Sequence, residues 1–529
     1  MTEDAAPGAP PSSKRTSALV GAGILLSRLL GLLRQTLIAK YLGANLVSDA
    51  FNGAFRITNI LQNLFGEGAL SASFIPVYAR ALEHGDEDEA DRIAGAIAAI
   101  LAVVVAVIVL VGVLAAPWVV QLVVGGFTGE TLALTIRLTR ILFPGAGIFV
   151  MSAWCLGILN SHRKFFLSYA APVFWNVAMI VALLAFGPRR GEVELVVVLA
   201  WASVIGAALQ MGVQLPSVFR LLKHPRFIPD IAFPPVREAV RNFLPAFMTR
   251  GVVQLSGYVD IWLASYINAR GVVTLIQNAQ TIYMLPISLF GMSVSAAELP
   301  EMSRDSGTDS AAMERLRARL NSALPRVAFF VVPSAIAFFV MGEAISSVLL
   351  EHGKFGPLES MRTWAILAGS AVGLVASALG RLYSSTFFAL RDTRTPLWFA
   401  VARVVLTGVL GYVFAFPLPR ALGLAPWTGA AGLTASAGLA GWVEFILLRR
   451  AVSARIGPTG IPRSLLARLW IAGLVAGGAG FGVMHLMASV HHSLRGATGI
   501  VMFCVAYGVA TLALGVPEAK SIVARVLRR

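Results

Sequence analysis

Residues 18–42 read ALVGAGILLSRLLGLLRQTLIAKYL, and this apolar run contains two arginines, Arg28 and Arg34. A run of this length can cross a bilayer, because a transmembrane helix needs about 20 apolar residues. A charged side chain near the bilayer centre costs at least ~2.5 kcal/mol, so such residues tend to face a polar interior and to mark a functional site. The stretch therefore predicts a membrane-spanning helix whose guanidinium groups point toward a polar space.

The composition of the whole chain also indicates a membrane protein. Of its 529 residues, 57% are hydrophobic and 13% are charged, whereas soluble domains carry about 25% charged residues. The apolar runs are continuous rather than alternating in polarity, which favours helices over a transmembrane barrel. Basic loops on one side of a membrane explain the net charge of +16, so no nucleic-acid partner is expected. The predicted fold class is an all-α polytopic membrane protein.

The apolar runs divide the chain into about fourteen predicted spans of membrane-crossing length. The spans are 18–43, 51–79, 93–124, 132–159, 167–187, 193–219, 242–268, 273–300, 324–350, 362–388, 396–417, 428–448, 466–488 and 496–516. Lysine and arginine gather in alternate loops, and the positive-inside rule then places both termini in the cytoplasm. The first span is too long for a cleaved signal peptide and is expected to remain as an anchor.

The two halves of the chain resemble each other at a shift of about 224 residues. Residues 71–76 (SASFIP) align with 295–300 (SAAELP), and the loops 161–165 and 391–396 occupy matching places. Chance similarity between apolar helices is the alternative explanation. A duplication of six-span units would place both copies in the same orientation, as parallel repeats that form two lobes with a cleft between them.

This duplication predicts the domain organisation. The predicted parts are a disordered cytoplasmic tail (1–17), an N-terminal six-helix lobe (18–222), a C-terminal six-helix lobe (236–450), two extra helices (463–518) and a basic cytoplasmic tail (519–529). The two extra helices fall outside the duplication. A transporter of a water-soluble anion has no evident need for them. A lipid-linked substrate would keep its tail in an apolar groove while its head crosses a polar cavity, and these helices are expected to form that groove.

The second span contains the clearest polar stripe of the chain. Arg56, Asn59, Asn63 and Glu67 are spaced so that they share one helical face, and Asp49 lies just before the span. In a bilayer this face must point at a water-filled cavity or at paired partners. Two interpretations remain open: the arginines of the first two spans line a cavity, or they pair with Asp49 or Glu67 and hold the helices together.

Charged residues also lie in the predicted spans of the second half. Arg250 and Asp260 occupy the seventh span, where they could act in a cavity or pair with each other, and Gln280 could serve in coupling or as an interhelical hydrogen-bond partner. Arg381 and Arg403 are expected to snorkel or to pair locally.

The balance of these charges favours an anionic ligand. A mainly cationic cavity suits phosphate or diphosphate, whose oxygens match the fork of an arginine. A drug or cation antiporter would instead need acidic residues, and Asp260 is the clear candidate for that role.

No catalytic or cofactor-binding motif is evident in the sequence. It lacks a GxxxxGK[ST] phosphate loop, HExxH and GxSxG. Its two cysteines, Cys155 and Cys504, both lie in predicted spans and offer neither a metal-binding spacing nor a disulfide framework. We therefore expect no enzyme activity, no metal and no cofactor.

The motifs of the first two spans resemble the MurJ (MviN) family, whose members are lipid II flippases of the bacterial cell envelope within a superfamily of multidrug, oligosaccharide-lipid and polysaccharide exporters. The matching motifs are Ser27-Arg28-x-Leu30-Gly31-x-x-Arg34, Asp49-Ala50-Phe51-x-x-Ala54-Phe55-Arg56-x-x-Asn59 and Leu64-Phe65-x-Glu67-Gly68-Ala69-x-Ser71-x-x-Phe74-x-Pro76.

The resemblance implies a function in peptidoglycan synthesis at the cell inner membrane. The substrate would be an undecaprenyl-diphosphate-linked disaccharide-pentapeptide, lipid II, driven across by an ion gradient or the membrane potential. Arg28 and Arg34 match the family's cavity arginines, and Asp49 and Glu67 match its acidic positions. Membrane lipids and cell-wall synthesis proteins are the other expected partners.

The chain departs from the family pattern at three places. Gln35 replaces an acid after the second arginine, Gln62 and Asn63 replace one or two arginines, and Gln280-Thr281 replaces an Asp-Arg pair in span eight. Each lost charge-assisted hydrogen bond removes ~1.5–3 kcal/mol from a diphosphate site. Two alternatives therefore stay open: a flippase for another polyprenyl-diphosphate-linked glycan, and a non-transporting scaffold for cell-envelope enzymes.

Overall fold

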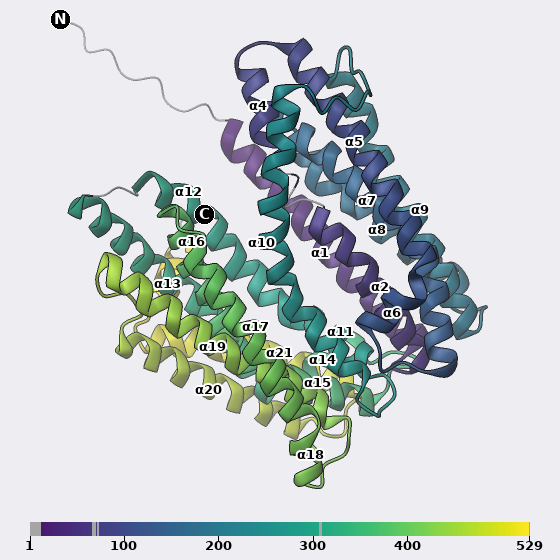
Figure 1. Ribbon diagram of the computed structural model, residues 1–529. Coiled ribbons are helices and arrows are strands. Elements are labelled where there is room, and N and C mark those ends of the chain that lie inside the picture. The colour runs from purple at the N-terminus through teal and green to yellow at the C-terminus, as the bar shows by residue number, and fades with distance from the viewer. Residues whose placement is uncertain (1–11, 66–69, 71–72, 306–308, 528–529) are drawn as a thin grey trace, which may run out of the picture. The chain divides into compact units, whose positions relative to one another are not determined.

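The computed structural model describes residues 12–65, 70, 73–305 and 309–527. These residues form helices joined by short loops, with no strand among them (Figure 1), so the all-α prediction is confirmed. Residues 1–11 of the predicted tail lie outside this part of the chain, and the first helix, α1 (Ser12–Leu42), already begins at Ser12.

Ten helical segments of the described chain are long and apolar enough to cross a membrane, and a bent helix pair raises the number to eleven. The ten are α5 (Glu87–Leu114), α7 (Gly129–Ser161), α8 (Phe165–Phe186), α9 (Glu192–Leu221), the continuous segment Val272–Arg304, α13 (Ser310–Val340), the segment Arg394–Ala421, α19 (Thr428–Ile456), α20 (Arg463–Leu486) and α21 (His492–Ala513). The protein is thus a multi-pass membrane protein.

Three further helices, whose side chains are only partly described in α1 and α10, lie at the remaining predicted spans and are not among these ten. They are α1, α2 (Leu46–Phe65) and α10 (Pro234–Ser265). Each carries arginine, which is costly in hydrocarbon unless the side chain finds water or a partner. The total of about fourteen spans stays a prediction.

The chain forms two compact units. Unit 1 comprises residues 1–38, 54–120 and 132–251, and unit 2 comprises residues 39–53, 121–131 and 252–529. The end of α1 and the start of α2 therefore belong to unit 2, although the rest of both helices belongs to unit 1. The two lobes expected from the duplication do not have the same boundaries as these two units. The expected lobe boundaries remain a proposal.

Unit 1 is built on long apolar helices that approach closely at glycines. Helices α8 and α9 run side by side (Figure 1), and a Cβ on Gly206 would lie 2.7 Å from the Trp175 ring. The short helix α4 (Ile75–Glu83) packs against the start of α5. α6 (Ala116–Val123) follows α5 directly along the chain.

Ion pairs tie the polar loops of unit 1 together. Arg92 pairs with Asp230 at 2.6 Å, and Arg80 pairs with Glu238. The Arg92 guanidinium lowers the pKa of the Asp230 carboxyl by bonding to its charged form. These pairs connect α4 and the start of α5 with the start of α10 and the loop before it.

Unit 2 contains a bent span in which close helix contact requires glycine. Helices α15 (Pro357–Ala371) and α16 (Leu374–Ala389) meet at an angle of 42°. A Cβ on Gly373, at this bend, would lie 2.4 Å from the Cα of Gly438 on α19. Helix α17 (Arg394–Ala415) packs along α19 as well, and the short α18 (Pro417–Ala421) follows it.

The segment Val272–Arg304 has three parts. Helix α11 (Val272–Pro286) is followed by a π-helical turn, η1 (Ile287–Met292), and by α12 (Ser293–Asp305). π-helical turns are rare and are frequent at functional sites.

The extra C-terminal helices lie against α13 and α14 (Gly342–Leu350). α20 packs beside α21 and against α13, while α21 packs against α14. The Tyr507 hydroxyl donates to the Phe329 carbonyl at 2.6 Å and fixes α21 to α13. The short α22 (Pro517–Leu527) follows. The lipid-tail groove expected here remains a proposal.

Two turns repeat the same geometry at matching places of the two halves. Among described residues other than glycine, Arg163 (φ 57°) and Arg391 (φ 58°) have positive φ. In each turn this residue donates its amide to the carbonyl three residues earlier, and the next residue donates to the carbonyl five residues earlier. This pattern is a Schellman helix end, and its recurrence supports the duplication.

The crossing at Gly373 gives a stability prediction. Gly373→Ala should lower the apparent melting temperature of the purified protein by a few degrees, because the new methyl meets backbone and overpacking costs about 1–3 kcal/mol. The matched control is Gly380→Ala on the same helix, where no packed neighbour lies within 4 Å of the added Cβ. Equal melting temperatures for the two variants would contradict this description of the crossing.

Candidate functional site

The polar stripe predicted on α2 is present in its described part. Arg56, Asn59 and Asn63 are half-buried, whereas Ile57 and Leu61 on the other side of the helix are buried. The assignment of this stripe to a cavity stays a prediction, and Glu67 lies outside the described residues.

Arg34 is held in one orientation within unit 1. Its Nη1 donates to Asn176 Oδ1 at 3.0 Å, and its guanidinium lies 4.3 Å from the centre of the Trp175 ring. Both partners come from α8, so a hydrogen bond and a cation–π contact position the side chain without neutralising it. Within unit 1 the described partners of Arg34 are therefore an amide and an aromatic ring, and the expected alternative of pairing with an acid stays open. Arg28, on the same helix, is exposed.

The carboxylate of Asp49 is hydrogen-bonded within unit 2. It is 3% exposed and lies in the part of α2 that belongs to unit 2. Its Oδ2 accepts the Gly271 amide at 2.8 Å, and its Oδ1 accepts the amide and the hydroxyl of Thr274 at 2.8 and 2.9 Å. Asn52 donates to the same hydroxyl at 3.1 Å. We call this arrangement the Asp49 cap.

The Asp49 cap uses the start of α11 as an anion site. The first amides of a helix have no intrahelical acceptor, and the helix dipole favours a negative charge there. Gly271 adopts a positive φ of 78° at this position, and a Cβ on it would lie 2.4 Å from the Ala44 carbonyl oxygen. The carboxylate therefore joins residues 39–53 to the second half of the chain.

The other nominated residues are spread along unit 2 and its boundary. Arg250 lies within the continuous helix α10, but its side chain is outside the description. Asp260 on α10 and Gln280 on α11 are half-buried. Of the nominated residues whose side chains are described, Arg28, Arg34, Arg56, Asn59 and Asn63 belong to unit 1, and Asp49, Asp260 and Gln280 belong to unit 2.

Sequence reasoning missed a polar cluster among the membrane helices of unit 2. Arg403 on α17 pairs with Glu444 on α19 at 3.0 Å, which confirms its expected local pairing. Tyr283 on α11 lies close to Ser377 and Arg381 on α16. Glu444, an acid inside a predicted span, was the signal that could have identified the cluster.

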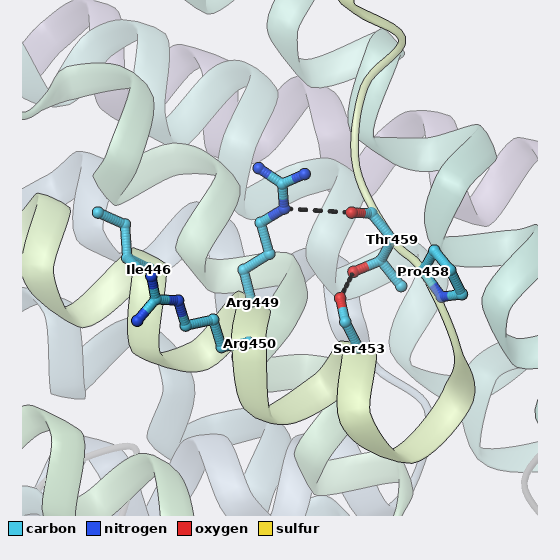
Figure 2. Close-up of a pocket in the computed structure, with 6 residues that line it drawn as sticks. All are labelled: Ile446, Arg449, Arg450, Ser453, Pro458 and Thr459. Atoms are coloured by element: carbon cyan, nitrogen blue, oxygen red, sulfur yellow. Dashed lines mark hydrogen bonds between the residues drawn. The ribbon is translucent and has the colours of Figure 1, made fainter.

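A pocket of about 540 Å³ lies at the end of α19, and its lining includes none of the nominated residues (Figure 2). Arg449 Nε donates to the Thr459 carbonyl at 3.1 Å, and the hydroxyls of Ser453 and Thr459 are 2.6 Å apart. These bonds hold the α19–α20 loop against the helix.

A comparison with protein families identifies the chain. The model described as "Lipid II flippase MurJ" matches residues 38–498. The chain belongs to this family. Flippases move lipids between leaflets rather than catalyse a covalent reaction, so the family is one of transporters.

Named members of the MurJ family match most of the chain. A probable lipid II flippase MurJ from Rhizobium meliloti (strain 1021) is 31% identical over 441 residues, which cover 82% of this chain and 79% of the relative. A lipid II flippase MurJ from Burkholderia cenocepacia is 32% identical over 440 residues, covering 82% of each.

Solved structures support the same fold. A structure titled "Lipid II flippase MurJ, inward closed conformation" has a TM-score of 0.78 at 23% identity and covers 97% of this chain and 100% of that chain. An inward-facing multidrug resistance transporter of the MATE family has a TM-score of 0.64 at 19% identity and covers 83% and 98%. These likenesses show the fold.

The Asp49 cap gives a testable prediction. Asp49→Asn keeps the side-chain size but removes the charge that holds two backbone amides, so amide hydrogen exchange in residues 271–275 should become at least about tenfold faster. Hydrogen-exchange mass spectrometry measures this. Asp309→Asn is the control, because Asp309 is exposed and caps α13 without a side-chain hydrogen bond. Unchanged exchange in residues 271–275 would show that the cap does not stabilise α11.

Proposed function

We propose that this protein is a lipid II flippase, which moves the lipid-linked peptidoglycan precursor from the inner to the outer leaflet of the bacterial inner membrane by alternating access. The match of residues 38–498 to the MurJ family carries this proposal. The relatives named as lipid II flippases cover about four-fifths of the chain and support the same cargo.

The cationic side chains of unit 1 suit the diphosphate of such a cargo. Arg34 is oriented by Asn176 and Trp175 with its charge intact, and Arg28 on the same helix is exposed. A guanidinium fork binds phosphate oxygens in pairs, and its preorganisation lowers the entropy lost on binding. We assign these two arginines to the headgroup, and the half-buried Arg56, Asn59 and Asn63 to the lining of the same cavity, together with Glu67 and Arg250.

Alternating access needs contacts that can form and break between states. The Asp49 cap is a candidate, because residues 39–53 group with unit 2 while the chain on both sides of them groups with unit 1. Buried charge-assisted hydrogen bonds are strong enough to hold one state and local enough to be replaced by water in another. Asp260 and Gln280 are proposed to act in ion coupling or in packing.

The remaining parts of the proposal concern the membrane and the partners. The basic loops favour cytoplasmic termini by the positive-inside rule. The lipid tail would follow a groove formed by α20 and α21, and cell-wall synthesis proteins would supply and consume the substrate. No nucleotide or other cofactor is required by this proposal.

The departures from the family pattern favour one alternative cargo. Gln62 and Thr281 remove cations that the resemblance would place near a diphosphate, so another polyprenyl-diphosphate-linked glycan is the second candidate. A scaffold without transport activity is the third. The intermediate that accumulates on the inner leaflet after depletion distinguishes the two cargoes.

Complementation tests the proposal. The chain should restore growth to a bacterium depleted of its own lipid II flippase, and Arg28→Ala/Arg34→Ala should fail to do so at equal membrane abundance and melting temperature. The matched control is Arg189→Ala/Arg420→Ala, which removes two exposed arginines outside the predicted spans. Failure of the wild type to restore growth contradicts the lipid II assignment. Rescue by the Arg28/Arg34 variant contradicts the assignment of these residues to the headgroup and supports a scaffold.

A further inference from the structure

One helix of unit 2 exposes a polar stripe inside an otherwise buried surface. Along α16 the side chains that are not buried are Ser377, Arg381, Ser384 and Phe388. Their spacing of four, three and four residues places them on one face of the helix. Every other side chain of α16 is buried.

The chemistry of this stripe excludes a lipid-facing role. Helix α5 shows what such a face looks like: its exposed large side chains include Val103, Val107, Leu110 and Leu114. On α16, three of the four outward residues are polar, and one is an arginine. A charge at this depth must reach water or a partner, so the face of α16 is adapted to a hydrated space.

Helix α11 extends the polar surface. Gln277, Gln280 and Thr281 are half-buried along its length, and Ser288 in the following turn η1 is half-buried as well. Tyr283, on the same helix as the two glutamines, lies close to Ser377 and Arg381 of the stripe on α16. α11 contributes no cation to this surface, since its sequence VVTLIQNAQTIYMLP contains neither lysine nor arginine.

The charge on this surface comes from Arg381. The neighbouring Arg403 is engaged by Glu444 at 3.0 Å. Arg381 is exposed, feels the charges of both residues of that pair, and has no carboxylate within ion-pair distance among the described residues. One positive charge is therefore left uncompensated in the cluster, at a position where hydroxyl groups of Ser377 and Ser384 are its neighbours on the helix face.

We propose that Arg381 is a phosphate-binding residue of unit 2, which takes diphosphate oxygens of the lipid-linked cargo with its exposed guanidinium fork. Ser377 and Ser384 supply hydroxyl donors on the same face, and the Arg403–Glu444 pair maintains the local packing. The identity of the cargo rests on the proposed function, whereas the anion site itself does not. With Arg381, α16 supplies a cation to this surface. Gln280 and Thr281, the residues of α11 on the same surface, supply none.

The test uses the full-length protein in lipid nanodiscs and two ligands, lipid II and inorganic pyrophosphate. Arg381→Ala should weaken the binding of both by about tenfold or more, as loss of a charge-assisted contact predicts. Arg381→Lys should recover part of the affinity, because it keeps the charge but not the fork. Arg420→Ala, which removes an exposed arginine from α18, should leave binding unchanged.

Moving the cation to another helix distinguishes a binding role of Arg381 from a structural one. Thr281→Arg in the Arg381→Ala background puts a guanidinium back on the same polar surface from α11, where Thr281 is half-buried. This double variant should regain pyrophosphate and lipid II binding, and growth in the complementation assay. Arg381→Met, which keeps the apolar stem, replaces the alanine variant if that variant does not fold.

The outcomes distinguish this inference from the proposed cargo. Arg381-dependent binding of pyrophosphate by a protein that does not bind lipid II upholds the site and overturns the cargo. Wild-type affinity for both ligands in a folded Arg381→Ala or Arg381→Met variant overturns the site and leaves the cargo intact. Failure of Thr281→Arg to restore binding, with Arg381→Lys also inactive, assigns Arg381 to packing and overturns the inference.

Discussion

A guanidinium group within an apolar helix needs water or a partner, and this requirement organises the interior of the protein. Arg34 meets it with an amide and an aromatic ring, and Arg403 meets it with a carboxylate. Arg381 is left exposed on a face with serines. Only the carboxylate neutralises the cation. The positive charges of Arg34 and Arg381 therefore remain available to a ligand, whereas that of Arg403 does not. Two available cations suit a transporter of anionic headgroups.

The same requirement explains the negative charge at Asp49. A buried carboxylate is costly unless hydrogen bonds satisfy it, and here the open amides at the start of α11 do so. These bonds require the start of α2 to lie next to the start of α11, although the two are separated by more than two hundred residues in the sequence. Glycine at 271 permits this approach because a side chain there would meet the Ala44 carbonyl.

Features that depend on local pattern could be predicted from the sequence. Helix positions follow from continuous apolar runs, the polar face of α2 follows from spacing, and the turns at Arg163 and Arg391 follow from the duplication. The MurJ resemblance was visible in the motifs of the first two spans and is confirmed.

Features that depend on distant packing could not be predicted. Nothing near Asp49 indicates that its partner is the start of a helix in the other half of the chain. Arg381 and Arg403 look alike as single arginines in apolar runs, and Glu444 on α19 decides which of them carries a free charge. The bend at Gly373 likewise depends on Gly438 of another helix.

Thiol accessibility tests most directly whether the face of α16 that carries Arg381 is exposed to water. Ser384→Cys and Ser385→Cys, in a Cys504→Ala background with the buried Cys155 retained, are treated in native membranes with membrane-impermeant methanethiosulfonates of either charge. Ser384→Cys should be labelled, whereas Ser385→Cys, at a position where the native side chain is 7% exposed, should not. Relative to a free thiol, the anionic reagent should be favoured by the nearby Arg381. Equal protection of both positions, or a preference for the cationic reagent, would contradict a hydrated anion-binding surface.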